Sequence, residues 1–153
     1  MKVEEKIKQL GLKIPDVPKP DANYIPARRV GNIIYISGQG CDINEMSSIK
    51  GRVGEFVSEE EGYNAAKFAV LNCLAVLKSE IKSLDKVKKV VYLRGYICSS
   101  SSYNNQHKVL NGASDLLIDI FGEKGKHARC AIGVNSLPNG IPVEIEMIVE
   151  VEE

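Results

Sequence analysis

The closing stretch of the chain holds two charged residues that could do chemistry, Arg129 and Glu144. Each begins or borders an apolar run, and ionised groups near a core are costly unless they are paired, hydrated or directed at a ligand. A guanidinium can bind a carboxylate through two parallel hydrogen bonds, and a glutamate can accept a hydrogen bond from an attacking water. Each residue is therefore either a strand-edge surface residue or part of a site.

Two nearby residues have simpler interpretations, and a third, His127, is placed by the strand alternation. Glu146 shares a strand face with Glu144, because strand side chains alternate with a period of two, and it fits a solvated carboxylate better. Cys130 adjoins Arg129, but no histidine is patterned with it as a base, so a core or interface thiol is favoured over a nucleophile. His127 is expected to point to the same side of its strand as Arg129.

The elements that must position these residues can be predicted from periodicity. Alternating runs at 129–134 and 143–151 flank LPNG at 137–140 and predict a closing hairpin. Runs at 27–30 and 32–37 around Gly31 predict an opening hairpin. A capping box from Ser58 to Glu61 predicts a helix that extends to about residue 84. Residues 87–98 are predicted as the central strand, and residues from about 103 to 121 as a second helix that Gly122 ends.

The resulting order, ββ-α-β-α-ββ, favours an α+β fold with both helices on one face of a sheet. The opposite face then lacks a cover, and its apolar runs are expected to pack against other subunits. The remaining segments are less regular. Residues 3–11 fit a short helix, the proline-rich residues 13–26 an extended surface arm, and the polar residues 41–57 a loop with room for a brief strand.

Length and composition restrict the class of protein. The 153 residues suit one domain, and 44% hydrophobic with 26% charged residues is a globular composition. Twenty basic residues balance twenty acidic ones, so a nucleic-acid partner is not favoured. No export signal or membrane span is recognised, and we expect a cytoplasmic protein. The four cysteines and two histidines form no metal-binding spacing, so no metal is expected.

Three motifs, NIIYISGQ, LNGASDLL and HARCAIGVNSLPNGIPVEIEMI, carry a resemblance over about residues 24–151. The chain resembles the Rid family, the YjgF-type reactive intermediate deaminases formerly labelled L-PSP endoribonucleases. The closing motif is the specific part of the match. The resemblance implies a chorismate-mutase-like (YjgF-type) mixed sheet with two helices on one face, assembled as a homotrimer with ligand clefts between subunits. It divides the chain into an N-terminal extension, residues 1–20, and a Rid/YjgF-like domain, residues 21–153.

The resemblance also assigns roles to particular residues. It makes Arg129 the carboxylate-binding arginine and Glu144 the acid that orients water, with Tyr24, Asn111 and Ala131 as further substrate-binding positions. Ala131 departs from the cysteine that is frequent there, which is harmless if that position acts through its backbone. Without the resemblance, Arg129 fits a salt-bridge residue, Tyr24 a packing residue of the arm and Asn111 a surface residue.

The implied activity is hydrolytic deamination of reactive 2-enamine or 2-imine acids, such as 2-aminoacrylate, to 2-keto acids and ammonia. It requires no cofactor. The alternative is a non-enzymatic protein that binds a 2-keto acid or a similar metabolite in the same clefts. A ribonuclease is disfavoured, because the sequence has neither a patterned histidine pair nor a basic groove.

Overall fold

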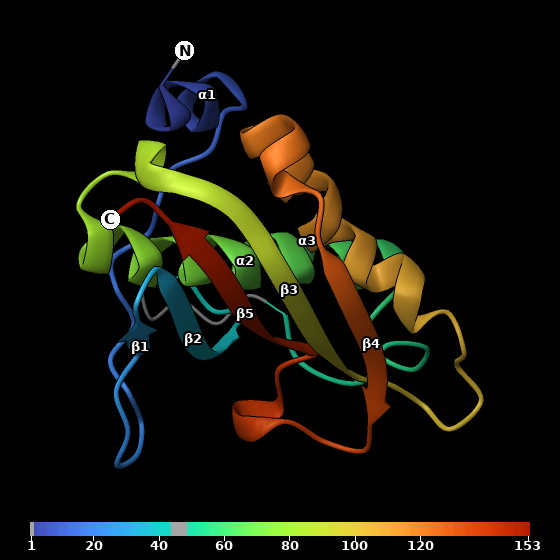
Figure 1. Ribbon diagram of the computed structural model, residues 1–153. Helices are drawn as coiled ribbons and strands as arrows, with labels where there is room; N and C mark the ends of the chain where they lie inside the picture. Colours follow the sequence, from blue (N-terminus) through green and yellow to red (C-terminus); the bar gives the residue numbers. More distant parts are fainter. Residues whose placement is uncertain (1, 44–48) are drawn as a thin grey trace.

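The computed structural model describes residues 2–43 and 49–153 (Figure 1). The strands are β1 (Ala27–Val30), β2 (Ile33–Gly40), β3 (Val87–Cys98), β4 (Ala128–Val134) and β5 (Val143–Val151). The helices are α1 (Val3–Gln9), α2 (Glu59–Ile81) and α3 (Gln106–Phe121), with short 3₁₀ turns η1 (Leu84–Lys86), η2 (Gly122–Gly125) and η3 (Pro138–Gly140). The predicted order of strands and long helices is confirmed. Residues 44–48 of the predicted loop lie outside the described residues.

The strands form one mixed sheet in the order β1-β2-β5-β3-β4, antiparallel except for the parallel pair β3 and β4. The opening hairpin is confirmed, with Gly31 at a positive φ of 59° in its turn. The closing hairpin is wrong, because β3 lies between β4 and β5. The chain crosses from β3 through α3 to a parallel β4, and β5 then returns to the other edge of β3, where it also pairs with β2. Strand β3, which was predicted as the central strand, lies between β5 and β4, and the third of the five strands is β5.

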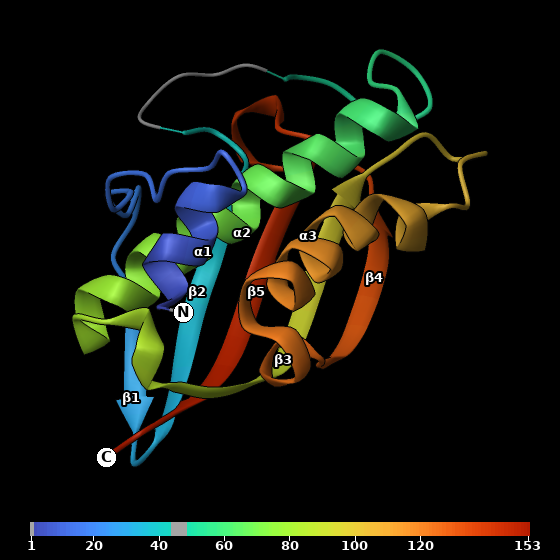
Figure 2. The same ribbon diagram turned by 90° about the horizontal axis from the view of Figure 1, so that it is seen from above.

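Helices α2 and α3 cover one face of the sheet, as predicted (Figure 2). Helix α2 contacts β2 and β5, while α3 contacts β3 and β4. The Ser58 Oγ accepts a hydrogen bond from the Glu61 N–H at 3.1 Å, which confirms the serine half of the predicted capping box. The two helices touch where Gly112 meets Tyr63, since a Cβ on Gly112 would stand 1.9 Å from the Tyr63 carbonyl oxygen. Only glycine permits this approach.

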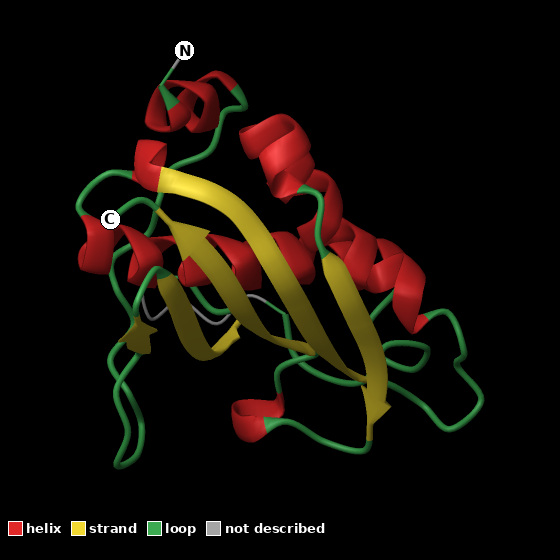
Figure 3. Cartoon of the chain, in the orientation of Figure 1, coloured by secondary structure: helices red, strands yellow, loops and turns green. Residues whose placement is uncertain are grey.

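The other face of the sheet carries no helix of the described chain (Figure 3). Its side chains include Tyr35, which is 49% exposed, and the half-buried Tyr92, Tyr96 and Ile148. A surface this rich in aromatic and aliphatic groups is typical of an interface. Packing of this face against other subunits remains a prediction.

The N-terminal segment is attached to the helical side of the molecule. In α1 the Ile7 side chain is 2% exposed, the Val3 N–H donates to Asp85 Oδ1 at 2.7 Å, and Glu4 accepts from the Leu84 N–H at 3.3 Å. Residues 12–26 contain no helix or strand, as expected for an extended arm. The arm therefore leads from the helices to β1 and passes the end of β2.

Candidate functional site

The register of the sheet places Arg129 and Glu144 on opposite faces. Arg129 pairs with Leu93, whose side chain is fully buried on the helical side. Glu144 pairs with Tyr96, three residues further along β3. Because side chains alternate along a strand, residues three apart point to opposite faces. One copy of the chain therefore does not bring these two predicted catalytic residues together.

The Arg129 side chain is bound to α3. Its Nη1 donates to Ser114 Oγ at 3.0 Å, and its Nη2 donates to the His107 carbonyl oxygen at 3.1 Å. Asn111 lies between these two positions on the same side of α3, four residues after one and three before the other. Ala131 follows Arg129 on the same face of β4. Three predicted binding residues, Arg129, Asn111 and Ala131, thus occupy one region at the α3–β4 edge.

His127 also contacts Ser114. The distance between His127 Nε2 and Ser114 Oγ is 2.9 Å, and His127 Nδ1 lies 2.6 Å from the Gly125 carbonyl oxygen. The expectation that His127 and Arg129 face the same side is consistent with their shared contact to Ser114. Cys130 is half-buried on the opposite face of β4, where it pairs with Arg94, so His127 is not placed to act as its base. The interpretation of Cys130 as a core or interface thiol remains a prediction.

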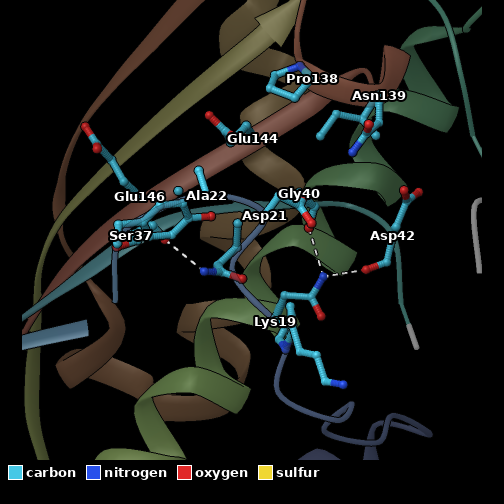
Figure 4. A pocket seen from close by; sticks show the side chains of 16 residues that line it. Lys19, Asp21, Ala22, Ser37, Gly40, Asp42, Pro138, Asn139, Glu144 and Glu146 are labelled. Atoms are coloured by element: carbon cyan, nitrogen blue, oxygen red, sulfur yellow. Dashed lines mark hydrogen bonds between the residues drawn. The ribbon is translucent and has the colours of Figure 1, made fainter. Parts of the chain in front are cut away.

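Glu144 borders a cavity of about 620 Å³ between the arm, the end of β2 and the start of β5 (Figure 4). Tyr24 of the arm, 46% exposed, lines the same cavity, so these two predicted residues lie in one region. Strand β2 changes register between Ile36 and Gln39, and Gly38 lies in this bulge. A Cβ on Gly38 would stand 3.1 Å from the Glu144 carboxyl carbon, so glycine leaves the space that the carboxylate fills.

The electrostatics distinguish Glu144 from Glu146. Glu146 accepts hydrogen bonds from Arg94 Nη1 at 2.7 Å and from the Tyr96 hydroxyl at 3.1 Å, so it is paired rather than merely solvated. The Glu144 carboxylate makes no hydrogen bond or ion pair with any residue that the structure describes. Burial, and secondarily the charge of Glu146, raises the pKa of Glu144 above its ordinary value. A carboxylate of this kind is suited to accept and return a proton.

Within residues 2–43 and 49–153, no group of three or more histidine, cysteine, aspartate or glutamate side chains could hold a metal ion. None of the described helices is long and apolar enough to cross a membrane.

Sequence reasoning missed Ser114 and Gly38. Ser114 is 8% exposed on a helix face that otherwise carries Leu110, Ala113 and Leu117. A polar residue within the buried stripe was the available signal, because a buried hydroxyl requires a hydrogen-bond partner. Gly38 gave a weaker signal, as SGQG resembles an ordinary strand end.

Comparison with known proteins shows which protein family the chain resembles. It matches the family model described as "YjgF/chorismate mutase-like, putative endoribonuclease" over residues 4–146. Protein TCP17 of Trypanosoma cruzi is 37% identical over 97% of this chain and 94% of that protein. The 2-iminobutanoate/2-iminopropanoate deaminase of Dermatophagoides farinae is 29% identical over 92% of this chain and 95% of that protein.

A solved structure supports the same grouping at the level of the fold. The crystal structure of Atu1372 from Agrobacterium tumefaciens, a protein with unknown function, superposes with a TM-score of 0.92 at 37% identity. The match covers 98% of this chain and 92% of that one, so it includes α1 and the arm. The family model matches most of the chain and the solved structure shares its fold, so the chain belongs to the YjgF/Rid family.

Proposed function

We propose that this protein hydrolyses small 2-imine acids, formed from 2-enamine acids such as 2-aminoacrylate, to 2-keto acids and ammonia. The observation that carries the proposal is the contrast between Arg129, held ready to bind an anion, and Glu144, an unpaired carboxylate with a raised pKa. Membership of a family that includes an iminobutanoate deaminase supports the same reaction class.

The position of the two residues on opposite sheet faces determines how the site would be assembled. We propose a homotrimer in which Arg129 of one subunit meets Glu144 and Tyr24 of its neighbour. The uncovered sheet face (Figure 3) would supply the apolar area for such an assembly. The cavity beside Glu144 would then be one wall of an intersubunit cleft, and Arg129 would close it.

The proposed reaction balances with water as its one co-reactant. The guanidinium of Arg129 binds the substrate carboxylate, and Glu144 accepts a proton from the water whose oxygen bonds to the imine carbon. The imine nitrogen takes that proton to give a neutral carbinolamine. Glu144 then takes the proton of the new hydroxyl and passes it to the nitrogen as the carbon–nitrogen bond breaks, which leaves the carbonyl of the 2-keto acid and ammonia. Because the imine is already reactive, positioning supplies much of the rate gain that is required.

The test measures keto-acid release from imines that an amino-acid oxidase generates. Arg129→Ala and Glu144→Gln should each lower the enzyme-dependent rate by at least about 100-fold, as expected for a catalytic acid–base group or an essential binding group. Glu150→Gln is the matched control, because Glu150 lies on the same strand and face as Glu144 and pairs with Lys88 and Lys89 instead. If Arg129→Ala hydrolyses the imines as fast as the wild type does, Arg129 is not the residue that binds the substrate carboxylate.

The same experiment separates the alternative function. A protein that binds 2-oxobutanoate but never accelerates imine hydrolysis would be a metabolite-binding module rather than an enzyme. For the enzyme, Glu144→Gln should keep most of the affinity for the keto acid, since Arg129 binds its carboxylate. Light scattering should give about three times 16.8 kDa. A fully active monomer would contradict the intersubunit cleft.

A further inference from the structure

Three side chains from α3, β4 and the segment before β4 form one continuous hydrogen-bonded chain. Arg129 Nη1 lies 3.0 Å from Ser114 Oγ, Ser114 Oγ lies 2.9 Å from His127 Nε2, and His127 Nδ1 lies 2.6 Å from the Gly125 carbonyl oxygen. Ser114 is 8% exposed and His127 is half-buried, so water competes little for these bonds.

The chemistry of the two end groups fixes the direction of every bond. A carbonyl oxygen can only accept, so His127 carries its hydrogen on Nδ1, and the Nε2 of a neutral ring is then an acceptor. A guanidinium can only donate, so Ser114 Oγ accepts from Arg129 and gives its own hydrogen to His127. Burial lowers the pKa of His127, as does the nearby charge of Arg129, and this favours the neutral ring that the chain requires.

We propose that Ser114 and His127 are positioning residues that hold the Arg129 guanidinium in the orientation that binds the substrate carboxylate. This inference rests on the proposed function, in which Arg129 is the carboxylate-binding group. The second hydrogen bond, from Arg129 Nη2 to the His107 carbonyl oxygen, fixes the plane of the guanidinium. Three of the five guanidinium N–H groups are left to bind a ligand.

The physical benefit is preorganisation. An arginine side chain loses much rotational freedom when it binds, and this loss weakens affinity unless the side chain is already ordered. The bond from Ser114 to His127 also polarises the serine oxygen, which makes it a better acceptor for Arg129. Alanine would fill the same place in α3, so the hydroxyl has a role beyond packing.

Binding and turnover provide the first test. Ser114→Ala and His127→Leu should raise KM for the imine, and Kd for 2-oxobutanoate, by about tenfold, the effect of losing one hydrogen bond to a charged group. The value of kcat should stay within about twofold, because Glu144 is untouched. His127→Gln should recover most of the affinity, since its amide oxygen can accept from Ser114. Ser79→Ala is the control, because the Ser79 hydroxyl donates to the Val76 carbonyl oxygen within α2, away from Arg129.

A spectroscopic measurement decides the inference independently of activity. With ¹⁵N-labelled arginine, the Arg129 guanidinium should rotate more slowly in the wild type than in Ser114→Ala, which keeps only the bond to the His107 carbonyl oxygen, with Arg129→Lys giving the assignment. His127 should show the neutral Nδ1–H tautomer at pH 7. Equal Arg129 mobility in the wild type and Ser114→Ala would overturn the inference.

The two tests also separate failure of this inference from failure of the proposed function. If the wild type neither turns over imines nor binds 2-oxobutanoate, the proposed function is wrong, and the mobility of Arg129 alone decides whether Ser114 and His127 position it. If the wild type is active but Ser114→Ala and His127→Leu leave KM unchanged, the positioning role is wrong while the function stands.

Discussion

Arg129 is fixed by two hydrogen bonds to α3, whereas Glu144, on the other face of the same sheet, has no hydrogen-bond partner among the described residues. The first region is a set of satisfied polar groups, and the second is a cavity beside an unpaired carboxylate whose pKa is raised by burial. An anion-binding group works best when it is already oriented, while a group that exchanges protons must stay unpaired. The two regions therefore suit two different parts of one reaction.

The largest expected effect comes from mixing variants that are each impaired in one region. Arg129→Ala keeps Glu144, and Glu144→Gln keeps Arg129, so a cleft between one subunit of each kind can hold both intact residues. In randomly assembled trimers at equal amounts, about a quarter of the clefts should be complete. Coexpressed or co-refolded variants should therefore recover up to about a quarter of wild-type activity. Activity no higher than that of either variant alone would show that the two residues do not meet across an interface.

A smaller effect is expected from Gly38→Ala, which alters the Glu144 region only. The added methyl would stand 3.1 Å from the carboxyl carbon of Glu144, so the carboxylate must shift by a few tenths of an ångström. We expect kcat to fall by about tenfold, since small misplacements of a catalytic group are costly. Affinity for 2-oxobutanoate should change little, because Arg129 lies elsewhere. Loss of affinity with unchanged kcat would contradict the division of roles between the regions.

The smallest effect concerns stability. The folded-state pKa of Glu144 is raised above 4.5, so the native state retains a proton that the unfolded state has already lost. The free energy of unfolding therefore falls as pH rises from about 4.5 through the raised pKa, and the penalty is complete above it. Glu144→Gln should remove this penalty and raise the melting temperature slightly at pH 7, with no gain at pH 3.

Glu146→Gln provides the matched comparison on the same strand. This substitution removes the charge that Arg94 pairs with, and because both side chains are about 40% exposed the loss should not exceed about 1 kcal/mol. Glu146→Gln should thus lower the melting temperature at pH 7, opposite in sign to Glu144→Gln. Thermal unfolding at the two pH values measures both, and shifts of the same sign would remove the distinction between the two glutamates.

Much of this protein was determined locally by its sequence. The run of β-branched and aromatic residues at 87–98 is β3, Ser58 begins α2, and Gly31 makes the first hairpin turn. These features depend on residues close together in the chain, through steric preferences and short-range hydrogen bonds. The closing motif also singled out Arg129 and Glu144, and the resemblance to the Rid family supplied the roles expected of them.

Only the tertiary structure decided how those residues are related. Whether β4 pairs with β5 or with β3 depends on hydrogen bonds between segments far apart in the chain, and the LPNG connection is compatible with either. The insertion of β3 puts Arg129 and Glu144 on opposite faces, which a closing hairpin did not reveal. The contact of Ser114 with His127 and Arg129 likewise exists only because α3 packs behind β4. Pairing and packing over such distances are set by the whole core, so no local pattern encodes them.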